Sequence, residues 1–152
     1  MDLTRKLVLA LATGGYVGYI PVAPGTFGSV VGLFVYWLIA LLPLPAVFLL
    51  MAGFAAVSVW IAHQAAAILG TEDPKQVVVD EIIGMMAALF ALPFHPVVWI
   101  AGFLLFRGFD IIKPFPINYL EKRCPGGLGI VIDDVVAGIF ANILLRGILL
   151  FV

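Results

Sequence analysis

The stretch that decides the fold runs from Ala46 to Leu69 and reads AVFLLMAGFAAVSVWIAHQAAAIL. It contains no Asp, Glu, Lys or Arg, and as a helix it is long enough to cross the roughly 30 Å hydrocarbon core of a bilayer. The polar segment Gly70 to Lys75 then ends the helix. The whole chain is 64% hydrophobic, whereas soluble domains are about 45–50% apolar. We therefore predict an integral membrane protein.

Further apolar runs lie on both sides of this stretch. Val30 to Leu42 precedes it across the turn Pro43-Leu44-Pro45, and the last run extends from Val135 to Val152. Between them, Ile82 to Leu92 and Val97 to Phe106 are each about half a bilayer long at about 1.5 Å per residue. These two short runs form either one kinked helix or a hairpin that returns to its starting face.

The distribution of Lys and Arg favours the hairpin. The turns at 43–45 and 93–96 carry neither residue. The polar segments carry Arg5, Lys6, Lys75, Arg107, Lys113, Lys122 and Arg123. If all these segments are cytoplasmic, the positive-inside rule is satisfied throughout. That arrangement requires the hairpin, because a single span would place Asp80 and Asp110 on opposite sides of the membrane.

We expect an all-α, polytopic membrane helix bundle that forms a single domain over residues 1–152. It should contain a short re-entrant or broken helical hairpin and have its active site at the cytoplasmic membrane face. The net charge of −1 gives no electrostatic support for nucleic-acid binding. The single cysteine, Cys124, excludes an intramolecular disulfide, and His63 and His95 lack the spacing of a zinc site.

A glycine-rich segment, Pro24-Gly25-Thr26-Phe27-Gly28-Ser29, directly precedes the run that begins at Val30. Glycines let backbone N–H groups approach an anion, hydroxyls add donors, and a helix N-terminus favours negative charge. Thr26 and Ser29 are therefore candidate phosphate ligands. An ordinary N-cap explains the same residues equally simply.

Two pairs of adjacent carboxylates are candidate metal ligands. Asp80-Glu81 opens the helix that begins at Ile82, and Asp133-Asp134 opens the last helix after Gly126-Gly127-Leu128-Gly129. One carboxylate would suffice to complement a helix dipole, and like charges side by side repel unless a cation compensates them. Metal binding is thus our interpretation of both pairs, with helix capping as the alternative.

Three charged residues, Arg107, Asp110 and Lys113, follow one another in steps of three before Pro114. This spacing places them near one face of a helix. Arg and Lys suit phosphate, whereas Asp110 either orients the two cations or joins the metal. The alternative is a surface ladder of salt bridges.

These clusters together predict Mg²⁺-assisted phosphoryl chemistry at a membrane surface. Ionisable groups near a membrane are costly and mark functional sites, and clustered carboxylates suit a hard cation. The candidate catalytic residues are Asp80, Glu81, Arg107, Asp110, Lys113, Asp133 and Asp134. The candidate metal ligands are Asp80, Glu81, Asp133 and Asp134, and the candidate phosphate ligands are Thr26, Ser29, Arg107 and Lys113.

In this order, the clusters resemble the phosphatidylglycerophosphatase A family of bacteria. The resemblance covers about residues 14 to 145. Its motifs are Pro24 to Ser29, Val79 to Met85, Phe106 to Ile117, Gly126 to Ile130, and Asp133-Asp134 with Ala137-Gly138. His63-Gln64 also falls where such proteins often have these residues. His63 either makes an interhelical hydrogen bond or lines the site.

The resemblance implies a Mg²⁺-dependent enzyme of phospholipid biosynthesis. Such an enzyme removes the terminal phosphate from phosphatidylglycerophosphate at the cytoplasmic face of a bacterial inner membrane, giving phosphatidylglycerol and phosphate. A rival interpretation is a small membrane transporter or scaffold with a polar ion-binding centre. That rival needs carboxylates at mid-bilayer depth, whereas those in this sequence sit at predicted helix starts.

Overall fold

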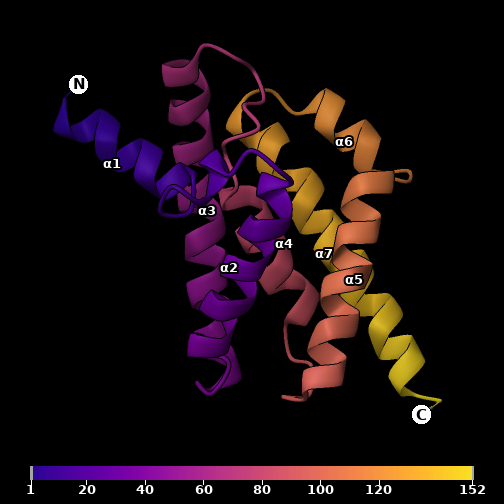
Figure 1. The fold of residues 1–152 in the computed structure, drawn as a ribbon. Helices are drawn as coiled ribbons and strands as arrows, with labels where there is room; N and C mark the ends of the chain where they lie inside the picture. The colour runs from indigo at the N-terminus through magenta and orange to yellow at the C-terminus, as the bar shows by residue number, and fades with distance from the viewer. Residues whose placement is uncertain (1, 152) are drawn as a thin grey trace.

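Seven α-helices and one short 3-10 helix make up the part of the chain that this computed structural model describes, residues 2–151 (Figure 1). No β-strand occurs within that range, which confirms the all-α prediction. The elements are α1 (Leu3–Ala12), η1 (Val17–Tyr19), α2 (Pro24–Ile39), α3 (Leu44–Leu69), α4 (Val79–Leu89), α5 (Pro96–Ile112), α6 (Ile117–Arg123) and α7 (Gly127–Leu149). Residues 1 and 152, which the predicted domain includes, lie outside the described range.

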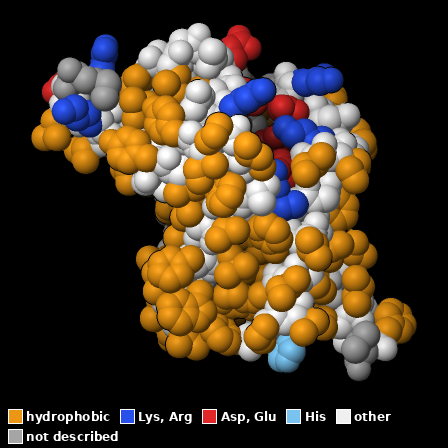
Figure 2. All heavy atoms as spheres, viewed as in Figure 1, with side chains coloured by type: hydrophobic (Ala, Val, Ile, Leu, Met, Phe, Trp, Pro, Cys, Tyr) orange, Lys and Arg blue, Asp and Glu red, His pale blue; other side chains and the backbone are white. Residues whose placement is uncertain are grey.

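Two helices, α3 and α7, are long and apolar enough to cross a membrane, and α2 is a shorter apolar helix. Apolar side chains cover the sides of the bundle (Figure 2). On α3, Phe48, Leu49 and Trp60 are each more than half exposed. A large exposed apolar surface suits lipid rather than water. The helices and this surface together indicate a membrane protein.

The short helix α4 is buried along nearly its whole length. It packs mainly against α7 and α2. The contact with α2 is close because Gly32 lacks a side chain: a Cβ there would lie 2.6 Å from the carbonyl oxygen of Ile82. Asp80 and Glu81 lie in the first turn of α4. The packing of α4 therefore holds these two acidic residues within the bundle.

Two helices begin earlier than the apolar runs predict. α2 begins at Pro24, so Thr26 and Ser29 lie inside the helix rather than before it. α7 begins at Gly127, so Asp133 and Asp134 lie in its second turn, and the expectation that they open the helix is wrong. The early start is possible because a Cβ on Gly127 would overlap the backbone of α3, which glycine avoids. A capping role for the Asp133-Asp134 pair is thereby excluded.

The segment between α4 and α5 turns back rather than continuing as one kinked helix (Figure 1). Side chains of α7 hold this turn. The Asn142 amide donates to the carbonyl oxygens of Ala88 and Phe90 at 3.0 and 2.9 Å. The Arg146 guanidinium donates to those of Phe90 and Ala91 at 2.8 and 3.0 Å. These bonds satisfy carbonyls that the end of α4 leaves free.

Candidate functional site

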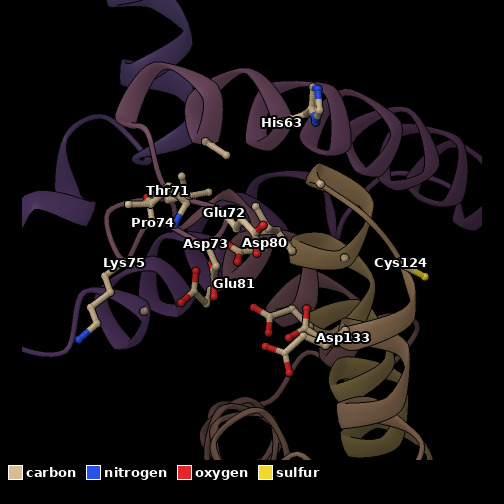
Figure 3. Close-up of a pocket in the computed structure, with 18 of the residues that line it drawn as sticks. His63, Thr71, Glu72, Asp73, Pro74, Lys75, Asp80, Glu81, Cys124 and Asp133 are labelled. Carbon is tan, nitrogen blue, oxygen red and sulfur yellow. The ribbon is translucent and has the colours of Figure 1, made fainter.

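A cavity of about 1040 Å³ opens at one end of the bundle, where α2, α4 and α7 begin and α3 and α5 end. Acidic and basic side chains gather in a hollow there, in contrast to the apolar sides (Figure 2). All seven candidate catalytic residues line the cavity, although they come from three helices and one loop. In the close-up, Asp80 and Glu81 approach Asp133 across the cavity (Figure 3).

Three carboxylates form the core of the site. Ligand oxygens of Asp80, Glu81 and Asp134 lie within 4.8 Å of one another. Asp80 Oδ1, Glu81 Oε2 and Asp134 Oδ2 are buried, and among residues 2–151 they have no hydrogen-bond partner. Burial raises the pKa of Asp80 well above its usual range, and the carboxylates of Glu81 and Asp134 raise it further. Unpartnered oxygens held this close favour a bound cation, and an all-oxygen donor set suits a hard one.

Glycines bring these carboxylates together. Gly84 lies one turn after Asp80, and a Cβ on it would lie 2.7 Å from the carbonyl oxygen of Asp134. Gly138 lies one turn after Asp134, and a Cβ on it would overlap the carbonyl oxygen of Gly84. Small residues at a helix crossing allow two backbones to approach closely. The crossing of α4 and α7 therefore places their acidic residues side by side.

Arg107 lies beside this carboxylate cluster. Its Nη1 lies 2.6 Å from Asp110 Oδ2, one turn further along α5. A Cβ on Gly25 would lie 3.2 Å from the same Nη1 and would overlap Glu81 Oε1. The glycine at the start of α2 thus makes room for a carboxylate and a guanidinium of other helices. Arg107 Nε is buried and, in the described part of the chain, has no acceptor.

The two hydroxyls that we expected to bind phosphate take different positions. Ser29 is buried, its hydroxyl donates to the carbonyl of Gly25 at 2.8 Å, and it accepts a bond from Arg107 Nη1 at 3.4 Å. Neither Ser29 nor Thr26 is among the described residues that line the cavity. Ser29 therefore reaches the site through Arg107.

Lys113 does not share a helical face with Arg107 and Asp110, contrary to the prediction. It ends α5 in the left-handed conformation, with φ of 46°. Its ammonium donates to Asp133 Oδ2 at 2.6 Å and to Glu121 Oε1 at 2.9 Å. Burial alone would lower the pKa of Lys113, but these two carboxylates raise it above its usual range. Lys113 is therefore held as a cation between α6 and α7.

This arrangement separates the two residues of the Asp133-Asp134 pair. Asp134 faces Asp80 and Glu81, whereas one oxygen of Asp133 accepts from Lys113. Glu121, the second partner of Lys113, was missed by sequence reasoning, since no local pattern distinguishes it from a surface carboxylate. A charged residue on the short helix α6 becomes recognisable as part of a site only when the fold brings its partner to it.

His63 and Cys124 line the same cavity outside the carboxylate cluster. The His63 side chain is exposed, and a Cβ on Gly126 would lie 2.6 Å from its Nδ1. The sulfur of Cys124 points away from the labelled carboxylates (Figure 3). The ring of His63 on α3 thus packs against Gly126 at the start of α7.

The fold and the site together define a helical membrane protein with a carboxylate cluster suited to a divalent cation and neighbouring cations suited to phosphate. The family model described as phosphatidylglycerophosphatase A matches residues 10–149. The chain belongs to this family, which confirms the resemblance seen in its motifs.

Similar proteins support this assignment. Phosphatidylglycerophosphatase A of Escherichia coli is 38% identical over 143 residues, covering 93% of this chain and 81% of the relative. That of Haemophilus influenzae is 38% identical over 135 residues, covering 88% and 83%. A Bacteroides thetaiotaomicron relative, whose name proposes a phosphatidylinositol-3-phosphatase, is 38% identical over 149 residues, covering 91% of each chain. No solved structure was found to match the chain.

Proposed function

We propose that this protein hydrolyses the terminal phosphate monoester of phosphatidylglycerophosphate, giving phosphatidylglycerol and inorganic phosphate. The observation that carries the proposal is the pairing, in one cavity, of three clustered carboxylates with the cations Arg107 and Lys113. Membership of the phosphatidylglycerophosphatase A family supports the choice of substrate. The relative named for a phosphoinositide suggests that related sites accept other lipid phosphates.

The donor set fits Mg²⁺, with Asp80, Glu81 and Asp134 as the residues that would hold it. When bound, such an ion polarises phosphoryl oxygens and offsets negative charge that develops on them. Asp133, our fourth predicted ligand, accepts instead from Lys113 through one oxygen, and its other oxygen is buried without a partner in residues 2–151. We assign Asp133 to the positioning of Lys113.

Arg107 and Lys113 would bind the phosphate and neutralise its charge as the ester breaks. The oxygen of a water molecule bonds to phosphorus, the bond from phosphorus to the glycerol oxygen breaks, and a proton from the water ends on that oxygen. Asp110 and Ser29 both accept from Nη1 of Arg107 and hold its guanidinium in place. Ser29 thus acts through Arg107, whereas Asp110, which also lines the cavity, either orients Arg107 or joins the metal.

We further propose that the cavity faces the cytoplasm at the inner membrane of a bacterium. Lys75 and Lys122 both line the cavity, in agreement with the one-sided distribution of basic residues in the sequence. The turn between α4 and α5 lies at the opposite end of the bundle in Figure 1. At about 1.5 Å per residue, α4 is roughly half as long as a bilayer core is thick, which fits a hairpin that enters from the cytoplasmic side.

Phosphate release from purified lipids tests the proposal. The full chain in detergent micelles should release phosphate from phosphatidylglycerophosphate with Mg²⁺ and should release none with EDTA. Faster release from phosphatidylinositol 3-phosphate would reassign the substrate. No release from either lipid in Mg²⁺ would reject the phosphatase and favour an ion-binding transporter or scaffold.

A further inference from the structure

The helix α1 has two apolar faces, and only one of them packs against the protein. Val8, Leu9 and Ala12 are buried, and α1 contacts α3. The second face is a row of leucines one turn apart, with exposed fractions of 69% at Leu3, 55% at Leu7 and 57% at Leu11. Three large apolar side chains aligned on one face and exposed to this extent require a partner other than water.

Basic residues lie on the other sides of α1. At about 100° per residue, Arg5 lies about 160° and Lys6 about 100° around the helix from Leu7. Both are exposed, as is Asp2 at the N-cap. An apolar row with cations to its side and behind it is the pattern of a helix that lies in a membrane interface. Lys6 then points toward headgroups and water while the leucines face the hydrocarbon, and Arg5, which lies over the side of α1 that packs against the protein, lines a groove beside Trp60.

Exposed aromatic residues with polar atoms surround α1. Tyr16 and Tyr19, which follow it, are 55% and 47% exposed and stack at 6.2 Å between ring centroids. Trp60 of α3 is 56% exposed and lines a small groove together with Arg5. Trp and Tyr concentrate at the boundary between headgroups and acyl chains. Three such residues beside α1 place that boundary at the level of this helix.

The orientation of α1 also fits a helix that lies at the boundary between headgroups and acyl chains. In Figure 1, α1 projects sideways from the cavity end of the bundle, whereas α3 and α7 run along its length. If α3 and α7 cross the bilayer, α1 lies closer to its plane. In Figure 2, apolar atoms lie along the lower edge of α1, on the side toward the level of the apolar flanks of the bundle, and basic atoms lie above them.

We propose that α1 is an interfacial anchor whose partner is the lipid bilayer itself, with the leucine row buried at the boundary between headgroups and acyl chains. The anchor is tied directly to the site. The backbone N–H of Val78 donates to the carbonyl oxygen of Ala12 at 2.9 Å, and Asp80 follows two residues later. Anchoring α1 therefore holds the first turn of α4 at the depth of the lipid phosphates.

The test measures the depth of single residues in the full chain, without any activity readout. Single cysteines replace Leu7, Lys6 or Glu72 on a Cys124→Ser background, and each carries an environment-sensitive fluorophore. The proteins are reconstituted in phosphatidylcholine vesicles, and quenching by doxyl-labelled phosphatidylcholine is compared with quenching by aqueous iodide. Glu72, in the exposed loop after α3, serves as the aqueous reference.

We expect the label at position 7 to be quenched by doxyl lipid and protected from iodide, and the label at position 6 to behave like that at Glu72. If Leu7→Cys prevents folding, Leu3→Cys reports on the same row. Iodide quenching at position 7 equal to that at position 72 would show that α1 stands in water and would overturn the proposal. Protection from both quenchers would also overturn it, since a second protein copy would then cover the row.

Discussion

Gly84 of α4 lies directly against the backbone of Asp134 of α7: a Cβ on Gly84 would be 2.7 Å from the Asp134 carbonyl oxygen. The backbone of Asp134 thus packs at this helix crossing, and its side chain is part of the carboxylate cluster. The geometry of the site therefore depends on residues without side chains as much as on the acids themselves.

Replacing Gly84 with Ala should separate α4 from α7 and displace Asp80 and Glu81 from Asp134. A misplacement of about 1 Å at a catalytic centre costs on the order of 100-fold in rate. We expect a loss of that order in phosphate release at saturating Mg²⁺, together with a higher Mg²⁺ requirement. The control is Gly147→Ala on α7, where a Cβ would contact no described residue outside its own neighbourhood. Equal activity of the two variants would contradict the role given to the crossing.

Asp134→Asn tests the metal assignment. A neutral amide binds a hard dication more weakly than a carboxylate does, so this variant should need more Mg²⁺ for half-maximal activity. Phosphate release measured across a Mg²⁺ titration reports the shift. Glu72→Gln, which changes an exposed carboxylate at the cavity edge, is the matched control. An unshifted Mg²⁺ titration for Asp134→Asn would remove Asp134 from the set of ligands.

Variants of Lys113 and its partners should lower the rate of phosphate release without changing the Mg²⁺ requirement. Lys113→Ala should lower kcat by roughly 100-fold, as the loss of one preorganised charge donor does elsewhere, without moving the Mg²⁺ titration. Asp133→Asn should follow Lys113→Ala in this pattern, because its carboxylate accepts from Lys113. Glu121→Gln should have a smaller effect, since Glu121 is about one-third exposed at its side chain. A shifted Mg²⁺ titration for Asp133→Asn would restore it as a metal ligand.

The sequence predicted which charged residues gather in the cavity better than it predicted their local geometry. Fixed spacing and residue type single out Asp80, Glu81, Arg107 and Lys113 as candidates, because charges are rare in so apolar a chain. Asp110, the partner of Arg107, lies one turn along the same helix, whereas the partners of Lys113 come from other helices. The bond from Lys113 to Glu121 depends on a left-handed residue at the end of α5, which neither the hydrophobic pattern nor the charge pattern marks.

Helix boundaries were the least predictable feature. Apolar runs mark the lipid-facing and core parts of a helix, but α7 continues toward its N-terminus through Gly129 and Leu128 to Gly127, in a glycine-rich segment that ordinarily indicates a loop. These glycines serve close packing instead: a Cβ on Gly129 would overlap the carbonyl oxygen of Cys124. From the sequence alone, a glycine that allows a turn cannot be told from a glycine that allows two helices to approach closely, because the difference lies in the neighbouring helices.

The turn between α4 and α5 offers a prediction about stability. Asn142→Ala leaves the carbonyls of Ala88 and Phe90 without their amide donor and removes an acceptor from Arg146 Nε at 2.7 Å. An unsatisfied buried polar group costs about 1–3 kcal/mol, and we expect the free energy of unfolding to fall by that amount. Thermal unfolding in micelles measures it. Ile143→Ala, at a position that is 63% exposed, should cost less. The folded fraction of Asn142→Ala should keep its Mg²⁺ requirement, because the turn lies far along α4 from Asp80.

The last prediction concerns the side of the membrane that the cavity faces. Lys75 and Lys122 line one cavity although they lie on different loops and helices, so they must be accessible from the same side. Leu42, in the turn between α2 and α3, is 44% exposed at the other end of the bundle (Figure 1). The positive-inside rule assigns the lysines to the cytoplasm and the uncharged turn to the opposite side.

Single cysteines at positions 75, 122 and 42, on a Cys124→Ser background, should react with an impermeant maleimide accordingly. In intact cells the reagent should label position 42 alone, and after permeabilisation it should label all three. Labelling of position 75 and position 122 from opposite sides would break the shared cavity and the hairpin with it. Labelling of both from outside would keep the fold and invert the proposed orientation.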